Sequence, residues 1–161
     1  MTPDVPRLPE MRPIAIRDRE AFRGLFAELR PRQSEFTFTN LLMWRDAYQL
    51  RVSQVDDAIA IFSWRADLED SFLLPPLGPA ANADAVRRCL EHMAREGHAP
   101  RLARATEEDL TRLGLTEAEF LIESDRDQWD YVYLVRDLIE LRGNRYHGKR
   151  NHLEQFVGRY E

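Results

Sequence analysis

The segment Pro75-Pro76-Leu77-Gly78-Pro79 most limits how this chain can fold, because no helix or strand can run through it. Before it, residues 50–55 and 58–62 are rich in apolar and β-branched side chains, and the turn Asp56-Asp57 separates them. This pattern predicts a β-hairpin. A third short strand is expected over residues 72–74. We therefore expect three consecutive strands that end at this break.

Helices are predicted on both sides of these strands. Apolar residues at helical spacing indicate one helix that begins after Asp18 and ends before Pro31. A second helix is expected within residues 34–48. After the proline-rich break, Asn82 is a suitable N-cap and Gly97 a suitable end for the clearest helix of the chain.

Three more strands complete the expected order of elements. Residues 13–17 and 101–105 are predicted as strands, and a capping box at Thr106 begins a short helix that ends at Gly114. Residues 131–135 are apolar at every position, which predicts a central strand covered on both faces. The order indicates one layered α/β (α+β) domain, and we recognise no internal repeat.

Composition fits one globular domain. With 161 residues, a hydrophobic fraction of 43% and a charged fraction of 32%, the chain can bury a sizeable core. No apolar run approaches the roughly 20 residues of a membrane-spanning helix, and the N-terminus lacks the apolar stretch of a signal peptide. We therefore expect a cytoplasmic protein in which residues 1–12 are a loose leader and residues 13–161 form the domain.

Cysteine and histidine give little support for a metal site or a nucleophile. Cys89, the one cysteine, falls on the apolar face of a predicted helix, so a buried thiol is expected. His92 and His98 have no partner at ligand spacing and are predicted at the surface. His147 and His152 point in different directions on a helix. No catalytic residue, metal or cofactor is predicted.

The last part of the chain departs from an acidic background. The formal net charge of the whole chain is -5, yet only Glu154 opposes the cations of residues 142–160. These cations are Arg142, Arg145, Lys149, Arg150 and Arg159, and Lys149 is the only lysine in the sequence. This cluster indicates a local basic patch rather than a basic protein.

A helix over residues 144–160 would align apolar and cationic residues along one face. The aligned residues are Tyr146, Lys149, Arg150, Leu153, Phe156, Val157 and Tyr160. Cations on the continuation of an apolar stripe are expected to be half-buried, with their charged ends on a partner. That partner is either the acidic turn Asp125, Asp127 and Asp130 or an anionic ligand, and both interpretations stay open.

In the ligand interpretation, Lys149 and Arg150 contact an anionic group, helped by Arg145 and Asn151. Arg45, on the apolar side of the second predicted helix, is a further candidate for an anion contact, although an ion pair is the favoured explanation there. The apolar part of the stripe is a candidate interface, formed by Tyr146, Leu153, Phe156, Val157 and Tyr160.

Three segments together carry a resemblance to a known family: residues 34–48, residues 75–78 and residues 130–156. The last contains D-Y-V-Y-L, D-L-x-x-L-x-G and Y-H-x-K-R-N in order. From about Arg12 onward the chain resembles an uncharacterised bacterial family grouped with the C-terminal domain of phosphatidylglycerol lysyltransferases.

The resemblance implies an acetyltransferase-like (GNAT-like) fold, a mixed sheet flanked by helices, used twice in tandem with a cleft between the two lobes. Related members transfer an amino acid from aminoacyl-tRNA to a lipid headgroup. This chain is similar to the first lobe only, and its basic helix would lead into the second lobe. The implied partners are that second lobe and aminoacyl-tRNA or another anionic substrate.

We therefore expect one lobe of an aminoacyltransferase-like or acyltransferase-like protein, not catalytic alone. The alternative is a non-catalytic binding or structural module, with the basic helix in ion pairs or at a partner interface. A weaker alternative is a CoA-dependent N-acyltransferase. The chain lacks the glycine-rich pyrophosphate loop of such enzymes, so CoA binding is not expected. An isolated lobe would expose an apolar face and could form a homodimer through it.

Overall fold

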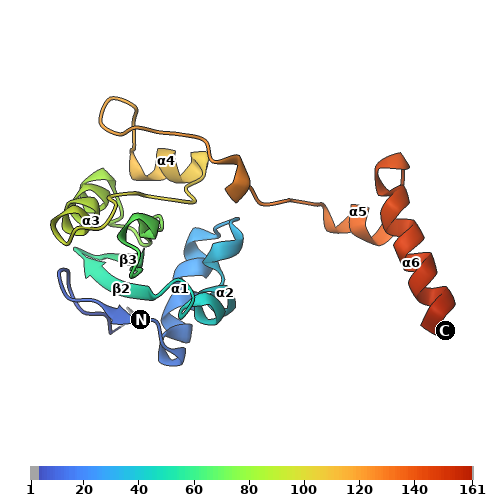
Figure 1. Cartoon of the computed structure of the whole chain (residues 1–161), viewed down its shortest axis with the longest axis horizontal. Helices are drawn as coiled ribbons and strands as arrows, with labels where there is room; N and C mark the ends of the chain where they lie inside the picture. Colours follow the sequence, from blue (N-terminus) through green and yellow to red (C-terminus); the bar gives the residue numbers. More distant parts are fainter. Residues whose placement is uncertain (1–3, 161) are drawn as a thin grey trace. The chain divides into compact units, whose positions relative to one another are not determined.

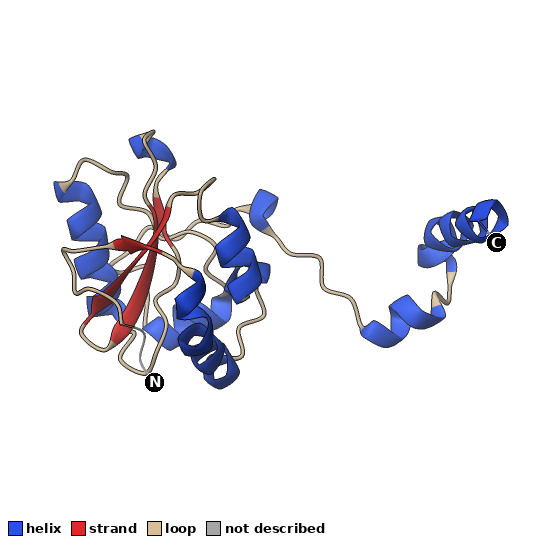
Figure 2. Cartoon of the chain, turned by 90° about the horizontal axis from the view of Figure 1, so that it is seen from below, coloured by secondary structure: helices blue, strands red, loops and turns tan. Residues whose placement is uncertain are grey.

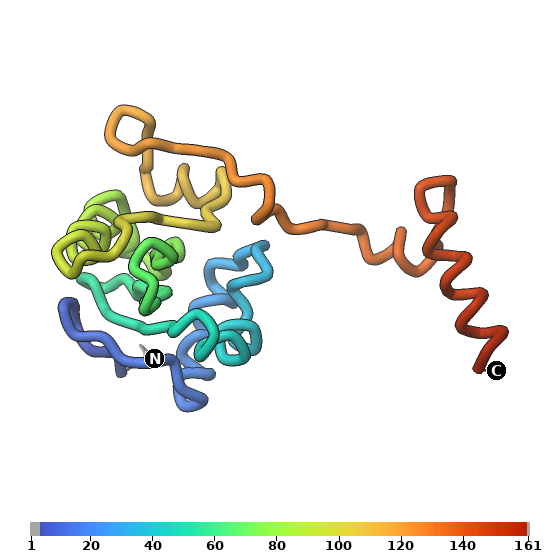
Figure 3. The backbone as a smooth tube through the Cα atoms, viewed as in Figure 1, coloured from blue at the N-terminus to red at the C-terminus, as the bar shows by residue number. Residues whose placement is uncertain are grey.

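The computed structural model describes residues 4–160 of the chain, which divides into two compact units. Unit 1 comprises Met1–Gln128 and unit 2 comprises Trp129–Glu161. Figures 1 and 3 follow the chain from its N-terminus through unit 1 and then into unit 2.

Unit 1 is built on a four-stranded antiparallel sheet with the order β1-β2-β3-β4 (Figure 2). The strands are β1 (Arg12–Pro13), β2 (Leu50–Val55), β3 (Ala58–Ser63) and β4 (Phe72–Leu73). The predicted hairpin is confirmed: β2 and β3 pair from Leu50↔Ser63 to Val55↔Ala58, and Asp56 in the turn has a φ of 53°. The fold is therefore a mixed α+β arrangement.

Within residues 4–128, unit 1 also contains four α-helices and four short 3₁₀ helices. They are η1 (Ile16–Asp18), α1 (Arg19–Leu29), η2 (Ser34–Phe36), α2 (Phe38–Trp44), η3 (Leu68–Asp70), α3 (Ala83–Arg95), α4 (Glu107–Leu113) and η4 (Arg126–Gln128). The predicted N-caps of α3 and α4 are confirmed. The Asn82 side chain accepts a hydrogen bond from the Ala85 N–H at 2.9 Å, and Thr106 and Asp109 form a capping box.

The core of unit 1 consists of two apolar clusters, one on each face of the sheet. Alternate side chains of β3 contribute to one cluster or to the other. Ile59 and Ile61 face a cluster that includes Phe22 of α1 and Leu41 of α2. The alternate residues of β3 face a second cluster with α3 and α4, and all six residues of the strand are buried. This alternation follows from the two-residue period of a strand. Figure 2 shows helices on both sides of the sheet.

A loose leader was expected over residues 1–12. Residues 1–3 lie outside the described residues, and residues 4–12 lie along β2. Val5 is buried, the Gln54 N–H donates to the Pro6 carbonyl at 2.7 Å, and the Leu8 N–H donates back to the Gln54 carbonyl at 3.0 Å. These bonds satisfy the open edge of β2 beyond the short strand β1. The described part of this segment is therefore anchored on the sheet.

Two predicted strands are shorter than expected. β1 covers Arg12–Pro13 instead of residues 13–17, because the chain turns into η1 where the Asp18 carboxylate accepts a hydrogen bond from the Ala15 N–H at 2.9 Å. Residues 101–105 contribute one parallel bridge, between Leu102 and Leu73. Arg104 then adopts a φ of 59°, which no strand accommodates.

Unit 2 contains α5 (Val135–Glu140), η5 (Asn144–Tyr146) and α6 (His147–Tyr160). The strand predicted over residues 131–135 is wrong for this structure: residues 131–134 are irregular, and Tyr131 and Val132 are 89% and 84% exposed. Their apolar pattern indicated burial, but a strand also needs a neighbour to pair with. Within residues 4–160, no backbone hydrogen bond reaches Tyr131 or Val132.

Candidate functional site

The basic residues that the sequence analysis singled out lie around the start of α6. This helix begins at His147 rather than at residue 144, because residues 144–146 form the 3₁₀ turn η5. Arg145 makes an ion pair with Asp137 of α5, and its guanidinium lies 4.7 Å from the Tyr146 ring centroid. Asp137 is thus the acidic partner that the structure gives Arg145.

Arg150 stabilises the connection between α5 and α6. Its Nη1 donates hydrogen bonds to the carbonyls of Leu141 and Gly143, the latter at 2.9 Å. Leu141 is the C-cap of α5, so Arg150 satisfies a carbonyl that the helix leaves without an internal partner. The hydrogen bonds of Arg150 Nη1 therefore stabilise the fold of unit 2.

Lys149 is the candidate whose charge has the weakest interaction within the described structure. Its Nζ lies 5.4 Å from the Tyr133 ring centroid, a cation–π contact at an exposed position. Among the described residues it has no ion pair with a carboxylate. A cation–π contact of this kind contributes about 0.5–1 kcal/mol, so the ammonium group can still bind an anion.

The remaining two candidates contact their own neighbours. Nδ2 of Asn151 lies 3.3 Å from Nε2 of His147, one turn earlier on α6. In unit 1, Arg45 donates to the Leu42 carbonyl at 2.8 Å and pairs with Asp46 at 3.4 Å. The ion pair that we favoured for Arg45 is therefore present.

The interface candidates divide into one buried and four exposed residues. Tyr146 is buried and its hydroxyl donates to Asp137 at 3.4 Å, so it holds α5, η5 and α6 together. Leu153, Phe156, Val157 and Tyr160 are 39–67% exposed on α6. The rings of Phe156 and Tyr160 pack against each other with centroids 4.9 Å apart. The exposed four leave an apolar stripe open.

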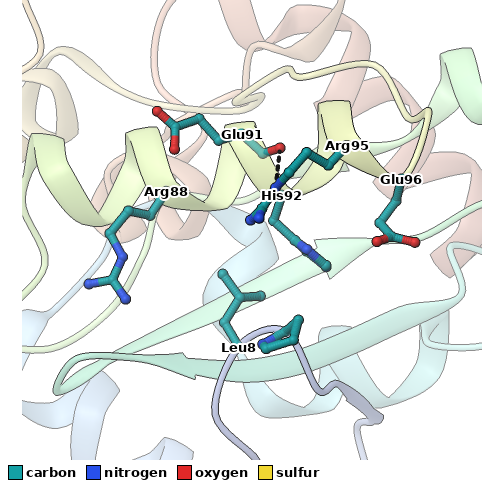
Figure 4. Close-up of a pocket in the computed structure, with 7 residues that line it drawn as sticks. Leu8, Arg88, Glu91, His92, Arg95 and Glu96 are labelled. Atoms are coloured by element: carbon teal, nitrogen blue, oxygen red, sulfur yellow. Dashed lines mark hydrogen bonds between the residues drawn. The ribbon is translucent and has the colours of Figure 1, made fainter.

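A groove in unit 1 lies between α3 and the N-terminal segment, with a volume of about 400 Å³ (Figure 4). Its lining residues are Leu8, Pro9, Arg88, Glu91, His92, Arg95 and Glu96. His92 points from α3 toward Leu8. Its Nε2 is buried and has no hydrogen-bond partner among the described residues.

The surface position predicted for His92 and His98 is wrong, because both are buried against Trp64. The His92 ring stacks on Trp64 with centroids 5.5 Å apart and planes at 17°, and the His98 ring lies 3.8 Å from the same ring. Nδ1 of His98 lies 2.8 Å from the Ser71 hydroxyl. Burial lowers the pKa of both histidines. Both contacts depend on tertiary packing.

Cys89 is buried, as predicted from its position on α3. Burial raises the pKa of its thiol to about 12, and the nearby Arg88 offsets this effect only in part. At neutral pH the side chain is therefore a thiol, which is a weak nucleophile.

The sequence analysis missed a cluster at the edge of the sheet in unit 1. Arg104 pairs with Glu35, and its guanidinium lies 4.9 Å from the Tyr48 ring centroid and 5.0 Å from that of Phe72. These residues come from four separate segments, so no spacing in the sequence relates them. The charges of Arg104 and Glu35 are paired with each other, which indicates a structural role.

In residues 4–160, no three His, Cys, Asp or Glu side chains gather as metal ligands would. Over the same residues, no helix is both long enough and apolar enough to span a membrane.

Comparison with known proteins places the chain in a family. Residues 26–161 match the family described as "Phosphatidylglycerol lysyltransferase, C-terminal". No curated protein matches. A solved structure, a conserved protein of unknown function from Bacteroides thetaiotaomicron VPI-5482, is 25% identical with a TM-score of 0.75; the match covers 99% of this chain and 51% of that one. The chain thus spans about half the length of that protein, and it belongs to the family of phosphatidylglycerol lysyltransferase C-terminal domains.

Proposed function

We propose that this chain is the N-terminal lobe of a bacterial aminoacyltransferase-like or acyltransferase-like protein and is not catalytic alone. In this proposal the lobe has an acetyltransferase-like (GNAT-like) fold, and a second lobe completes the cleft. The observation that carries it is the half-length match: a family member by sequence aligns over 99% of its length with 51% of a longer solved chain.

The contacts around Tyr146 support a division of roles among the basic residues. Arg145 and Arg150 hold α5, η5 and α6 together through Asp137 and two carbonyls. Lys149 has an exposed ammonium group beside them. The proposal therefore assigns anion contact to Lys149 first, with Asn151 next to it on the surface, and a positioning role to Arg145 and Arg150.

The substrate class follows from the family and the charge. Aminoacyl-tRNA offers phosphates for which an exposed ammonium group on a basic helix is suited. On this basis, a longer native protein transfers an amino acid from aminoacyl-tRNA, while the 161-residue chain binds tRNA weakly and transfers nothing. The proposed compartment is the cytoplasm.

The test has two steps. The intact mass of the native protein from its source cells is measured first, and a mass near twice the 18.9 kDa of this chain is expected. Transfer of a labelled amino acid from aminoacyl-tRNA is then assayed with the native protein and with the 161-residue chain. Transfer by the native protein alone supports the proposal. Transfer by the short chain, or a native mass near 18.9 kDa, contradicts it.

The contribution of Lys149 is measured with tRNA titrations of Lys149→Glu. We expect weaker binding with a shallower dependence on salt, because one phosphate contact is lost. Arg159→Glu, an equal charge change further along α6, is the matched control and is expected to change the affinity less. Equal losses of affinity in the two variants would mean that Lys149 contributes only through the general charge of the helix and makes no specific phosphate contact.

A second function has one observation in its favour. Both Arg145 and Arg150 already have partners within unit 2, as a structural module would require. In a non-catalytic binding or structural module, Lys149→Met would lower the melting temperature and leave tRNA binding unchanged. The opposite result favours the transferase-like lobe.

A further inference from the structure

A buried histidine without a hydrogen-bond partner faces the groove between α3 and the N-terminal segment (Figure 4). His92 is 4% exposed, and its Nε2 has no partner within residues 4–160. Buried polar atoms are normally hydrogen-bonded, because loss of water without a new partner is costly. Phenylalanine would fill the same space without that cost. A ligand in the groove would supply the missing partner.

Packing fixes the direction of the His92 ring. The ring stacks on Trp64 with centroids 5.5 Å apart, and the ring of Phe62 lies 6.4 Å away with the planes at 79°. Figure 4 shows the imidazole directed from α3 toward Leu8. Because these neighbours hold the ring in place, Nε2 is presented to the groove in one orientation.

The fold holds both walls of the groove. One wall is the second half of α3, which contributes residues 88–96. The other is the N-terminal segment, in which the Leu8 N–H donates to the Gln54 carbonyl at 3.0 Å and the Ser53 hydroxyl donates to the Glu10 carbonyl at 2.8 Å. A volume of about 400 Å³ is within the range of small-molecule sites. The groove is therefore formed before any ligand binds.

Two charged side chains that line the groove make no ion pair within residues 4–160. They are Arg95 and Glu96. Arg95 donates from Nε to the Glu91 carbonyl at 3.4 Å, which leaves the charge of its guanidinium without a carboxylate. Arg88 differs, because its Nη1 lies 2.7 Å from both carboxylate oxygens of Asp56. The groove therefore offers one cation and one anion to a ligand.

These two charges lie on opposite sides of His92. At about 100° per residue, Arg95 is roughly 60° to one side of His92 around the helix and Glu96 about 40° to the other. Burial lowers the pKa of His92 most, and Glu96 raises it while Arg95 lowers it, so both charges act on the imidazole. Glu96 is also the C-cap of α3, where the helix dipole favours a positive group.

From these observations we propose that the groove binds a small zwitterion, in which a carboxylate and an ammonium group lie close together on a short apolar body. The carboxylate accepts hydrogen bonds from the Nε2–H of His92 and from Arg95. The ammonium group donates to Glu96, and the apolar body contacts Leu8 and Pro9. A free α-amino acid has this chemistry.

Three molecules with the same apolar body test the proposal. They are L-leucine, 4-methylvalerate, which lacks the ammonium group, and isopentylamine, which lacks the carboxylate. In NMR titrations of the 161-residue chain we expect a dissociation constant of about 1 mM or lower for L-leucine. The other two should bind at least about tenfold more weakly, because each loses one charge-assisted contact. Equal affinities for L-leucine and 4-methylvalerate, or no saturable binding of L-leucine, would overturn the proposal.

His92→Phe tests the buried nitrogen. The variant keeps an aromatic ring against Trp64 and removes Nε2, so L-leucine is expected to bind at least about tenfold more weakly. In the wild type, L-leucine should shift the imidazole ¹⁵N resonances of His92 and leave those of His152, exposed on α6, in place. An unchanged affinity in His92→Phe would contradict the proposed hydrogen bond.

Variants of the two exposed charges give a test that does not depend on packing around Trp64. Arg95→Gln should weaken L-leucine and 4-methylvalerate at least about threefold and leave isopentylamine unchanged. Glu96→Gln should weaken L-leucine and isopentylamine and leave 4-methylvalerate no weaker. Arg23→Gln removes an exposed cation from α1, on the other face of the sheet, and is the matched control. Losses of the same size in the control would mean that binding follows overall charge, and this would overturn the proposal.

This inference goes beyond the proposed function and does not rest on it. The groove lies in unit 1, whereas Lys149 lies in unit 2. Lys149→Glu is therefore expected to leave the affinity for L-leucine unchanged, and His92→Phe to leave tRNA binding unchanged. A loss of L-leucine binding in Lys149→Glu would overturn the assignment of the site to unit 1.

Discussion

Arg104 and Glu35 form an ion pair in which Nη1 and Oε1 are 3.0 Å apart, and each side chain is less than one-fifth exposed. The guanidinium also contacts the rings of Tyr48 and Phe72. The pair therefore joins η2, which contains Glu35, to the segment between α3 and α4, which contains Arg104. A largely buried pair of this kind is costly to break, because removal of one member leaves the other charge without its counter-ion.

Arg104→Ala is expected to lower the free energy of unfolding by about 2 kcal/mol, through loss of the ion pair and of the two ring contacts. Urea unfolding followed by tryptophan fluorescence measures this change. Arg23→Ala is the control, because its pair with Glu20 spans 3.8 Å between side chains 74% and 67% exposed. A comparable loss in both variants would mean that burial of the Arg104 pair is unimportant.

Asp18 is expected to make unfolding sensitive to acid. Its burial would raise the pKa of its carboxyl, but hydrogen bonds from Arg12 and the Ala15 N–H outweigh burial and lower the pKa. Because the folded-state pKa is depressed, the stabilisation is present above the unfolded value of about 3.9 and is lost as the pH falls further. Asp18→Asn should lower stability by roughly 3 kcal/mol at pH 7 and flatten its dependence on pH below about 4.

Stability measured between pH 7 and pH 3 checks this expectation for the wild type and Asp18→Asn. Asp46→Asn changes a carboxyl whose side chain is 86% exposed and serves as the control. Parallel curves for the wild type and Asp18→Asn would exclude Asp18 as a source of the acid sensitivity.

His92 is expected to make stability depend on pH in a higher range than Asp18 does. Burial lowers the pKa of its imidazole, so the unfolded state binds a proton more readily than the folded state. The stabilisation is complete above the unfolded pKa of about 6.5 and is lost as the pH falls toward the lower folded value. His92→Phe keeps a ring against Trp64 and should reduce the loss of stability between about pH 7 and pH 5.

The measurement is urea unfolding at several pH values with tryptophan fluorescence as the signal. Some dependence on pH should remain in His92→Phe, because burial also lowers the pKa of His98. His152→Phe at an exposed position of α6 is the control. An unchanged pH dependence in His92→Phe would assign the effect to His98 alone.

Asn82→Ala is expected to cost about 1 kcal/mol, because the Ala85 N–H loses its capping acceptor. Asn82→Asp keeps an acceptor oxygen at the start of α3 and should be close to neutral. Thermal unfolding of unit 1 in both variants measures the difference. Equal destabilisation by alanine and aspartate would show that the amide group has another role.

Local signals in the sequence predicted much of unit 1. The β2–β3 hairpin, the Asn82 and Thr106 caps and the left-handed Gly114 each depend on a few consecutive residues, whose conformational preferences are short-range. The burial of Cys89 followed from helical periodicity in the same way.

The candidate site was predictable only as a list of residues. The sequence indicated that Arg145 and Arg150 need partners, and the structure supplies Asp137 and the carbonyls of Leu141 and Gly143. Which cation stays available depends on how α5 ends and η5 turns. A left-handed residue at position 141 has no clear sequence signal, because it is not a glycine.

The sequence by itself determined the β2–β3 hairpin of unit 1 and the caps that begin α3 and α4, and it showed that residues 131–135 are apolar. Only the tertiary structure decided that His92 and His98 pack against Trp64, that Arg104 meets Glu35, and that residues 131–134 lack a strand partner. The reason is physical: caps and turns are set by neighbouring residues, whereas burial and strand pairing require surfaces from distant parts of a chain.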